Sequence, residues 1–474
     1  MPRAVLTTAL ILTSLSWATA QTRPPNIIII LADDLGYGDL SCYHAAKFRT
    51  PHIDQLAAQG VRFTHCYAPF PYCAPSRATL LTGRYPFRHG LQANPFPGGD
   101  PLAKNADHLG LPASELTLAR LLQQKGYVSL AIGKWHLGHQ PQFWPTRFGF
   151  DHYFGIPYSN DMHPVRLYED EKVIEYPVVQ ATLTRRYTER AIHFIKENAN
   201  RPFFLYLAHA MPHKPLACSE DFYGKTGMGL YADTLAELDW SCGQLLDTLR
   251  QLGLDKHTLV VFTSDNGPWY GGSTGGLRGM KGQTWEGGVR VPLIFSMPGR
   301  LPTDRTIDVP VMLGDIFTTC LYAAGVNPPQ DRVIDGVNLW PLMSEGKPLD
   351  REAIYIFRGP QLMAIRQGKW KLHVAAPQPP KFKVYKPGDP YKDPRGPDGV
   401  RILAPYEQPH PSQYPGLLTG DPVTEIGLFD LENDPGEQHN LAEKYPEIVR
   451  KLSALADGVR KEMQKEARQR MRPH

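Results

Sequence analysis

Two pairs of oxygen-bearing side chains stand out because each pair directly follows an apolar run of residues. One pair is Asp33 and Asp34, and the other is Asp265 and Asn266. Adjacent carboxylates repel each other unless a cation or a proton intervenes, and hard oxygen ligands of this kind suit calcium or magnesium. An isolated Asp-Asp pair is more often a solvated turn. The second pair at another predicted strand end favours a metal site.

A single cysteine, Cys73, begins the second chemically interesting segment, residues 73–84. Pro75 marks a turn, and Ser76 and Arg77 open a helical pattern. The N-terminus of a helix and a neighbouring guanidinium would stabilise an anion beside the cysteine. A buried structural cysteine near a helix start is the commoner role for an arbitrary single cysteine. The residues alone therefore leave both interpretations open.

Basic side chains from three further segments could bind such an anion. They are Lys134, His136, His213 and Lys281. Lys134 and His136 lie in residues 133–138, directly after a predicted strand, and each could be an ordinary polar loop residue. His209 and Lys214 compete with His213 for the same role, and we prefer His213.

Lys281 lies in the glycine-rich segment 279–292. Its glycines are expected to allow close backbone approach. In the same segment, Glu286 and Arg290 are expected to form an ion pair that supports the loop.

Together these segments resemble the type I, formylglycine-dependent sulfatase family, and most of all its arylsulfatase and N-acetylgalactosamine-6-sulfatase branch. Residues 73–84 are similar to the signature of that family. Residues 133–138 and 279–292 match two more of its motifs, and the resemblance continues through residues 362–371 and 428–437.

The resemblance implies that Cys73 is oxidised to formylglycine, whose hydrated aldehyde is the nucleophile. One hydroxyl attacks sulfur and the second expels the product. The resemblance also implies a site for one calcium ion made by Asp33, Asp34, Asp265, Asn266 and the residue derived from Cys73.

The residues implied to act in catalysis are Cys73, Arg77, Lys134, His136, His213, Asp265 and Lys281. We hypothesise that Asp265 takes a proton from the attacking hydroxyl, and that His213 or Lys281 protonates the departing alcohol. His136 then removes a proton from the second hydroxyl, and sulfate leaves. The cationic side chains would stabilise the charge that develops as the S–O bond breaks.

The elements that must position these residues are predicted from periodicity. Continuous apolar, β-branched runs are typical of strands buried on both faces, and helical patterns alternate with them. The predicted strands are residues 26–31, 127–132, 203–208 and 258–263, and the predicted helices are residues 51–59, 116–125, 183–198 and 231–252. This alternation predicts an open α/β sheet that binds ligands beyond the carboxyl ends of its strands. The resemblance implies an alkaline-phosphatase-like mixed sheet sandwiched by helices.

The pattern changes after about residue 342. Short runs separated by turns predict an antiparallel meander over residues 353–357, 362–366 and 370–374. A further strand is predicted at 428–431 and an amphipathic helix at 445–469. We therefore predict a catalytic domain at residues 21–345 and a smaller C-terminal α+β domain at 346–474, with a proline-rich loop at 375–420.

Residues 1–20 are predicted to be a signal peptide, with Arg3, an apolar stretch and the cleavage site Ala18-Thr19-Ala20. The apolar stretch is too short to span a bilayer comfortably, so we expect export without stable membrane insertion. There is no Asn-x-Ser/Thr acceptor in the chain, which favours the bacterial periplasm or the extracellular space. A formylglycine-generating enzyme is the implied maturation partner.

Bulk composition gives no support for a nucleic-acid partner or for an anionic membrane surface. The chain has 51 basic and 47 acidic residues and a formal net charge of +4, and this balance is too weak to argue for a nucleic-acid partner, which we do not expect. Its six cysteines match no small disulfide scaffold.

The expected substrate is a sulfate ester of a carbohydrate or an aryl alcohol. Trp269, Tyr270 and Trp285 near the site could stack on a ring, although aromatic residues in loops as often pack internally. Two alternatives stay open. One is a formylglycine-dependent phosphonate monoester or phosphodiester hydrolase, and the other is a non-catalytic protein that binds sulfated glycans.

Overall fold

The computed structural model describes residues 23–43, 47–97, 108–163, 165–379, 381–390 and 408–470. The predicted signal peptide and part of the proline-rich loop lie outside these residues. Within the described ranges, no helix combines the length and the apolar character needed to cross a membrane.

A large mixed sheet forms the centre of the molecule. Its strands in spatial order are β10 (Arg305–Ile307), β2 (Val61–Tyr67), β9 (Arg290–Ser296), β8 (Thr258–Ser264), β1 (Asn26–Ala32), β7 (Phe203–Ala208), β3 (Val128–Lys134), β4 (His152–Ile156), β5 (Leu167–Glu169) and β6 (Lys172–Glu175), with β11 (Val311–Met312) also paired to β2. The central strands from β8 to β4 are parallel, and antiparallel pairs occur toward both edges. The four predicted strands are thus confirmed, and the sheet is mixed as the resemblance implied.

The apolar run of β1 explains its central place, because all seven of its residues are buried. Alternate side chains point to opposite faces of a strand. Ile27, Ile29 and Leu31 therefore belong to one hydrophobic core, while Ile28 and Ile30 belong to a second core on the other face.

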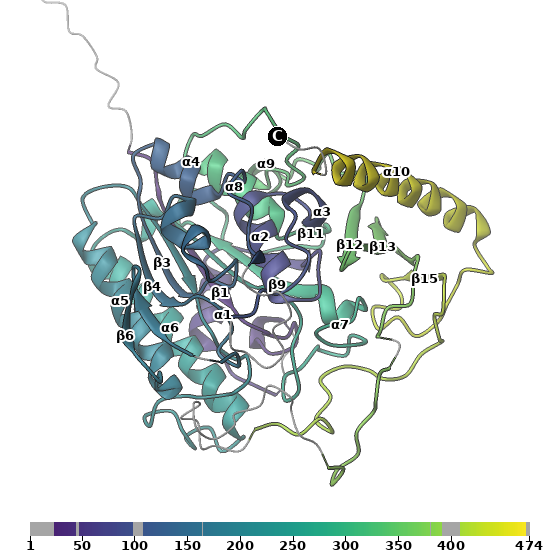
Figure 1. Ribbon diagram of the computed structural model, residues 1–474, viewed down its shortest axis with the longest axis horizontal. Coiled ribbons are helices and arrows are strands. Elements are labelled where there is room, and N and C mark those ends of the chain that lie inside the picture. Colours follow the sequence, from purple (N-terminus) through teal and green to yellow (C-terminus); the bar gives the residue numbers. More distant parts are fainter. Residues whose placement is uncertain are drawn as a thin grey trace, which may run out of the picture.

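Helices cover both faces of this sheet (Figure 1). On the face of the first core lie α2 (Cys73–Thr82), α4 (Leu118–Gln124), α8 (Gly314–Ala323) and α9 (Trp340–Glu345). On the face of the second core lie α1 (Pro51–Ala58), α5 (Leu183–Glu197) and α6 (Leu230–Gln251). The four predicted helices are α1, α4, α5 and α6, and their ends agree with the prediction within two residues.

A second, smaller sheet lies beside the first on the right of Figure 1. It is an antiparallel meander of β12 (Ile354–Arg358), β13 (Gln361–Gln367), β14 (Trp370–His373) and β15 (Gly427–Asp430), as predicted. The helix α10 (Pro446–Arg470) packs on it through Leu452, Ala456 and Val459. The same core includes Tyr67 and Phe70 from the first part of the chain, so the two sheets share buried contacts.

Candidate active site

The predicted metal-binding residues meet where the central parallel strands end. Asp33 and Asp34 follow β1, and Asp265 and Asn266 follow the neighbouring β8. The backbone N–H of Asp34 donates to Asp265 Oδ1 at 3.2 Å, and Asn266 Nδ2 donates to Asp34 Oδ1 at 2.8 Å. All four side chains are buried. The sheet order thus brings two dipeptides together that are more than 230 residues apart in the chain.

Cys73 is the first residue of α2 and is fully buried. Its Sγ lies 3.5 Å from Asp33 Oδ1 and 3.6 Å from Lys134 Nζ. One helical turn later, Arg77 Nε donates to Asp265 Oδ2 at 2.9 Å, and the same guanidinium lies 3.5 Å from Asp33 Oδ1. The N-terminus of α2 is therefore directed at the carboxylates, with Cys73 between the helix and the strand ends.

Two buried lysines complete the charge pattern. Lys134, at the end of β3, places its Nζ 2.5 Å from Asp33 Oδ2, and Lys281 Nζ lies 2.8 Å from Asp34. Burial alone would lower the pKa of the Lys281 ammonium, but the neighbouring Asp34 carboxylate outweighs burial and raises it. Lys281 is therefore a fixed positive charge at neutral pH. We call the group of these ionic side chains the strand-end cluster, which consists of Asp33, Asp34, Arg77, Lys134, Asp265 and Lys281.

The two histidines after β7 differ in their surroundings. His213 Nε2 lies 3.6 Å from Asp34 Oδ2, whereas His209 Nε2 lies 3.3 Å from the Ser241 hydroxyl on α6. Burial lowers the pKa of His209 to about 3, so this imidazole is neutral. Lys214 lies 3.5 Å from Asp161. The structure therefore places His213, rather than its two sequence competitors, against the carboxylates.

His136 lies farther along the same edge of the sheet. Its Nε2 is 3.3 Å from the carbonyl oxygen of Pro95, and its backbone has a left-handed φ of 61°. Asp34 also has a left-handed φ, of 60°. Such backbone is uncommon outside glycine and occurs often at functional sites. Both residues therefore stand in turns that the surrounding structure must hold in place.

The close approach of the strands depends on Gly133. A Cβ built on this residue would lie 1.8 Å from the carbonyl oxygen of Ala208 on β7. In the Lys281 segment, a Cβ on Gly288 would lie 2.0 Å from the carbonyl oxygen of Gln283. The expectation of close backbone approach in that segment is confirmed.

Ser159 belongs to the site and was missed by the sequence analysis. Its hydroxyl accepts a hydrogen bond from Lys134 Nζ at 3.0 Å and lies 3.5 Å from His213 Nε2. The serine follows β4 in a segment with no distinctive composition. Only its strand-end position, next to β3 in the sheet, could have indicated it.

The carboxylate and amide oxygens at the strand ends fit a hard divalent cation, whereas the thiol of Cys73 and the imidazole of His213 are softer ligands. Ligand atoms of Asp33, Asp34, Cys73 and His213 lie within 4.8 Å of one another. Asn266 Oδ1 is buried and meets no hydrogen-bond donor among the described residues. Burial raises the pKa of Asp33 and of Asp34, although Lys134 and Lys281 respectively oppose the rise. An oxygen without a donor beside crowded carboxylates is the environment that calcium or magnesium satisfies.

Glu286 connects the Lys281 segment to the small sheet. Its carboxylate lies 3.0 Å from Lys371 Nζ and accepts from the Tyr67 hydroxyl at 2.9 Å. The predicted ion pair between Glu286 and Arg290 is present at 3.7 Å, which confirms that it supports the loop. Lys371 is the nearer partner of Glu286. Lys371 also contacts Glu437 at 3.1 Å. We call the group Glu286, Lys371, His373 and Glu437 the bridging cluster.

The three aromatic residues near the site separate into two roles. Trp285 is buried against His373 and Phe429, with its ring 3.8 Å from the guanidinium of Arg278. Trp285 therefore packs internally. Tyr270 is buried as well, whereas Trp269 lines an open cavity beside Lys281.

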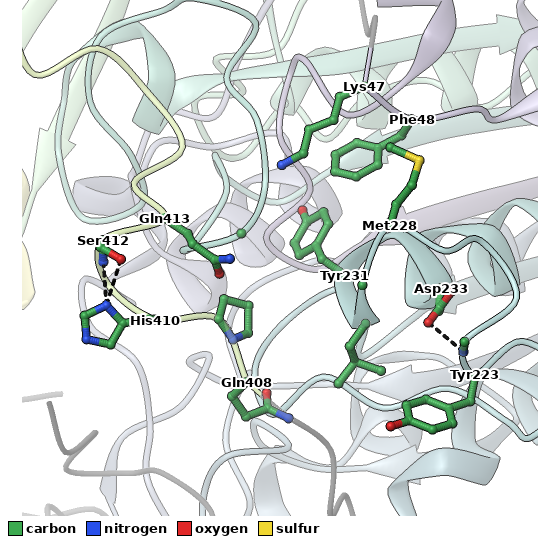
Figure 2. Close-up of a pocket in the computed structure, with 15 residues that line it drawn as sticks. Lys47, Phe48, Tyr223, Met228, Tyr231, Asp233, Gln408, His410, Ser412 and Gln413 are labelled. Carbon is green, nitrogen blue, oxygen red and sulfur yellow. Dashed lines mark hydrogen bonds between the residues drawn. The ribbon is translucent and has the colours of Figure 1, made fainter. Parts of the chain in front are cut away.

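A second hollow, of about 470 Å³, lies at the start of α6 (Figure 2). Figure 2 shows Phe48 and Tyr231 on one side of it and Gln408 and Gln413 on the other. None of the predicted site residues lines this hollow. This hollow is therefore separate from the residues predicted to carry the chemistry.

Comparisons with known proteins match both parts of the chain. A family model described as sulfatase matches residues 25–326, and a model for the C-terminal region of aryl-sulfatase matches residues 349–473. N-acetylgalactosamine-6-sulfatase from Canis lupus familiaris is 41% identical over 380 residues, covering 75% of this chain and 73% of that protein. Human arylsulfatase A is 35% identical and covers 94% of this chain and 89% of its own.

A solved structure described under the metabolism of multiple glycosaminoglycans by Bacteroides thetaiotaomicron has a TM-score of 0.76 to this chain. It is 28% identical, and the match covers 92% of this chain and 99% of that one. The similarity therefore extends over both sheets.

Proposed function

This chain belongs to the sulfatase family and is a sulfuric ester hydrolase, and we propose that its nucleophile is made by oxidising Cys73 to formylglycine. The observation that carries the proposal is the position of Cys73. Its Sγ lies within 3.6 Å of both the Asp33 carboxylate and the Lys134 ammonium, at a helix N-terminus. An oxygen at that position would have a carboxylate on one side and two cations nearby.

Formylglycine at position 73 would supply a hydrated aldehyde, with one hydroxyl to attack sulfur and one to release the product. Asp265 is held by Arg77 at 2.9 Å and is proposed to hold the proton from the attacking hydroxyl. His213 or Lys281 is proposed to give a proton to the departing alcohol. His136 is proposed to take the proton of the second hydroxyl.

Asp33, Asp34, Asp265, Asn266 and the oxidised Cys73 are proposed to hold one calcium ion. Asn266 Oδ1, which meets no donor in the part of the chain that the structure describes, supports this assignment. When bound, calcium would supply positive charge that favours an ionised nucleophile and the sulfate oxygens. In the strand-end cluster, three carboxylates balance three cations. A divalent cation would therefore leave two positive charges to attract an anionic ester.

Lys134 and Lys281 are proposed to bind the sulfate oxygens. Both ammonium groups are buried and held against Asp33 and Asp34. Preorganised charges of this kind act most strongly where water is excluded. Ser159 is proposed to orient Lys134 and His213 through its two contacts.

The modification is tested by mass spectrometry of the peptide that contains residue 73. Conversion of the CH2–SH side chain to an aldehyde removes one sulfur and two hydrogens and adds one oxygen, and we expect the corresponding mass in protein produced with a maturation enzyme. Unconverted Cys73→Ser should lose turnover and can trap a sulfated serine. The buried Cys320 lies in α8, so Cys320→Ala is the matched control and should keep activity. Near wild-type activity of Cys73→Ala would refute the nucleophile assignment.

The metal site is tested by chelation. We expect activity on an aryl sulfate to fall in a metal-free preparation and to return when calcium is added. Full activity without metal would exclude the calcium proposal while leaving the nucleophile assignment intact.

The substrate is proposed to be a sulfate ester of a carbohydrate or of an aryl alcohol. The alternative, phosphonate monoester or phosphodiester hydrolysis, is distinguished by kcat/KM on matched aryl sulfate and aryl phosphate diester substrates. We expect the sulfate to be preferred. A higher kcat/KM for the phosphate diester would instead favour the phosphonate monoester or phosphodiester hydrolase. A native protein in which Cys73 stays unmodified, and which binds sulfated glycans without turnover, would support the binding-only alternative.

We also propose that the chain is exported and that it divides into two domains. Residues 1–20 are proposed to direct the chain to the periplasm or the extracellular space, and N-terminal sequencing of the exported protein tests their removal. The boundary near residue 345 follows the change from the large sheet to the small one.

A further inference from the structure

A cavity of about 640 Å³ opens beside Lys281, where the strand-end cluster meets the small sheet. One wall carries Asn94, whose Oδ1 accepts a hydrogen bond from the backbone N–H of Ala74 at 3.0 Å. Ala74 follows Cys73 directly. Tyr72, directly before Cys73, lines the cavity as well, so the cavity adjoins the start of the helix that carries the proposed nucleophile.

The charged residues of this cavity are all positive. Lys214, Lys281 and Arg358 line it, and none of the described lining residues is an aspartate or a glutamate. Two of these cations already have a carboxylate partner: Lys281 lies 2.8 Å from Asp34, and Lys214 lies 3.5 Å from Asp161.

Arg358 differs from the two lysines. It is half-buried at the end of β12, and its guanidinium has no hydrogen bond or ion pair with any residue in the described part of the chain. A guanidinium presents a planar set of donors that matches a carboxylate or a sulfate in bidentate fashion. Arg358 is thus a cation available to an anionic ligand in the cavity.

The remaining walls suit a sugar ring. Tyr72, Phe96 and Trp269 line the cavity and are each half-buried, so part of each side chain reaches solvent. Lys214 Nζ lies 5.7 Å from the centre of the Trp269 ring. Aromatic side chains offer apolar faces of the size of a pyranose ring, while the cations bind its charged substituents.

We propose that Arg358 binds a second anionic group of the substrate, and that the natural substrate is an anionic oligosaccharide. The second group is a carboxylate or a sulfate. It belongs to the saccharide unit that carries the reacting sulfate ester, or to the neighbouring unit. This inference rests on the proposed function, because it takes Lys281 to mark the position of the reacting sulfate.

The surroundings of Arg358 allow a chain longer than one sugar. Arg358 also lines a further hollow, of about 560 Å³, on the small sheet. Met363 of β13, Val374 directly after β14, and the exposed Glu425 line it too. An oligosaccharide anchored at Arg358 can therefore continue across the small sheet.

The test measures competition against hydrolysis of a singly charged aryl sulfate, so that a ligand that is not itself hydrolysed still gives a signal. The first pair of probes is a monosulfated disaccharide with a uronic acid unit and the same disaccharide with its carboxyl group reduced to an alcohol. The second pair is a neutral disaccharide with one sulfate and the same disaccharide with two. For each pair, the ratio of the two inhibition constants is determined in each enzyme.

We expect wild type to bind the more anionic member of at least one pair about five- to tenfold more tightly, as suits a partly exposed charge-assisted contact. In Arg358→Gln that ratio should fall to near one, and in Arg358→Lys it should be partly retained. Arg147→Gln, an exposed arginine paired with Glu171 at 3.0 Å, is the matched control and should keep the wild-type ratio. Because each ratio compares two ligands on one enzyme, general damage to a variant cancels.

The probe pair whose ratio of inhibition constants falls in Arg358→Gln identifies the second anion. The uronic acid pair indicates a carboxylate, and the pair that differs in sulfate number indicates a sulfate. Equal inhibition constants within both pairs for wild type, or unchanged ratios in Arg358→Gln, overturn the inference while aryl sulfate hydrolysis continues. Absence of aryl sulfate hydrolysis by a fully converted wild-type enzyme overturns the proposed function and this inference with it.

Discussion

The strand-end cluster and the bridging cluster are both buried groups of lysines and carboxylates, but they differ in how their charges are balanced. In the strand-end cluster, burial raises the pKa of Asp33 and of Asp34, and the neighbouring lysines do not fully offset it. In the bridging cluster, burial would raise the pKa of Glu286, but Lys371, Arg290 and Arg366 outweigh it and lower that pKa.

The difference teaches how to separate a binding site from a structural ion network. Carboxylates that remain costly to ionise in spite of their partners gain from an additional cation. Carboxylates whose charge is already favoured by their partners gain nothing from a further ligand. This contrast supports the proposed binding role of the strand-end cluster, whereas the bridging cluster holds the Lys281 segment against the small sheet.

The largest expected effect is on turnover in the strand-end cluster. Asp34→Asn should lower kcat/KM for an aryl sulfate by about 10³-fold or more, because it removes a proposed metal ligand and the partner of Lys281. Its free energy of unfolding should fall less than that of Lys371→Met, because burial raises the pKa of Asp34 and the substitution removes a carboxylate that is costly to ionise there. Steady-state kinetics and urea unfolding measure the two effects, and a variant with unchanged kcat/KM contradicts the comparison.

The bridging cluster should respond in the opposite way. Lys371→Met leaves Glu286 and Glu437 buried without their ammonium partner, which costs about 3–5 kcal/mol in the free energy of unfolding. The exposed Lys369, which lies 2.7 Å from Asp430, is the matched control, and Lys369→Met should leave urea unfolding unchanged within error. Equal stability losses in the two variants would show that the network contributes no more than a surface pair.

One histidine beside each cluster tests the same difference between activity and stability. His213→Gln should lower kcat by about 10²-fold, as expected for loss of a general acid, with little change in stability. His373 Nε2 lies 2.6 Å from Glu437, so His373→Gln should lower the free energy of unfolding by about 1–2 kcal/mol. Its kcat, measured well below the unfolding midpoint, should stay within about threefold of wild type. If His213→Gln lowered stability without lowering kcat, and His373→Gln lowered kcat without lowering stability, the roles assigned to the two clusters would be wrong.

The smallest effect is the pH dependence of stability. The pKa of Glu286 is lower in the folded protein than its ordinary value of 4.5, so its ionised form stabilises the fold above that pH. That contribution is lost as the pH falls below 4.5. Urea unfolding between pH 5 and pH 3 should show a shallower decline in Glu286→Gln than in wild type. Glu345→Gln, which removes an exposed carboxylate, should keep the wild-type decline.

Much of the fold could be predicted because its signals are local. The continuous apolar runs of β1, β3, β7 and β8 can be buried only in a central sheet, and their ends carry the polar residues. Parallel strands expose their carboxyl ends at one edge, so Asp33 and Asp265 could be expected to meet.

Other parts of the site have no local signal. Ser159 is an ordinary loop serine until β4 is placed beside β3. Arg358 lies in a short strand 77 residues after Lys281, and only the packing of the small sheet brings both residues to one cavity. Trp285 was equally compatible with a ligand and with the core until Phe429 and His373 were seen against it.

By itself, the sequence determined which residue types were available at the strand ends: two pairs of oxygen ligands, a cysteine at a helix start, and lysines and histidines nearby. These follow from hydrophobic periodicity and short motifs, which depend on neighbouring residues. Only the tertiary structure decided that His213 rather than His209 faces Asp34 and that Lys371 neutralises Glu286. It also decided that Arg358 has no ionic partner among the residues that the structure describes. The physical reason is that charge balance depends on distances between segments far apart in the chain, and these distances exist only once the strand order is formed.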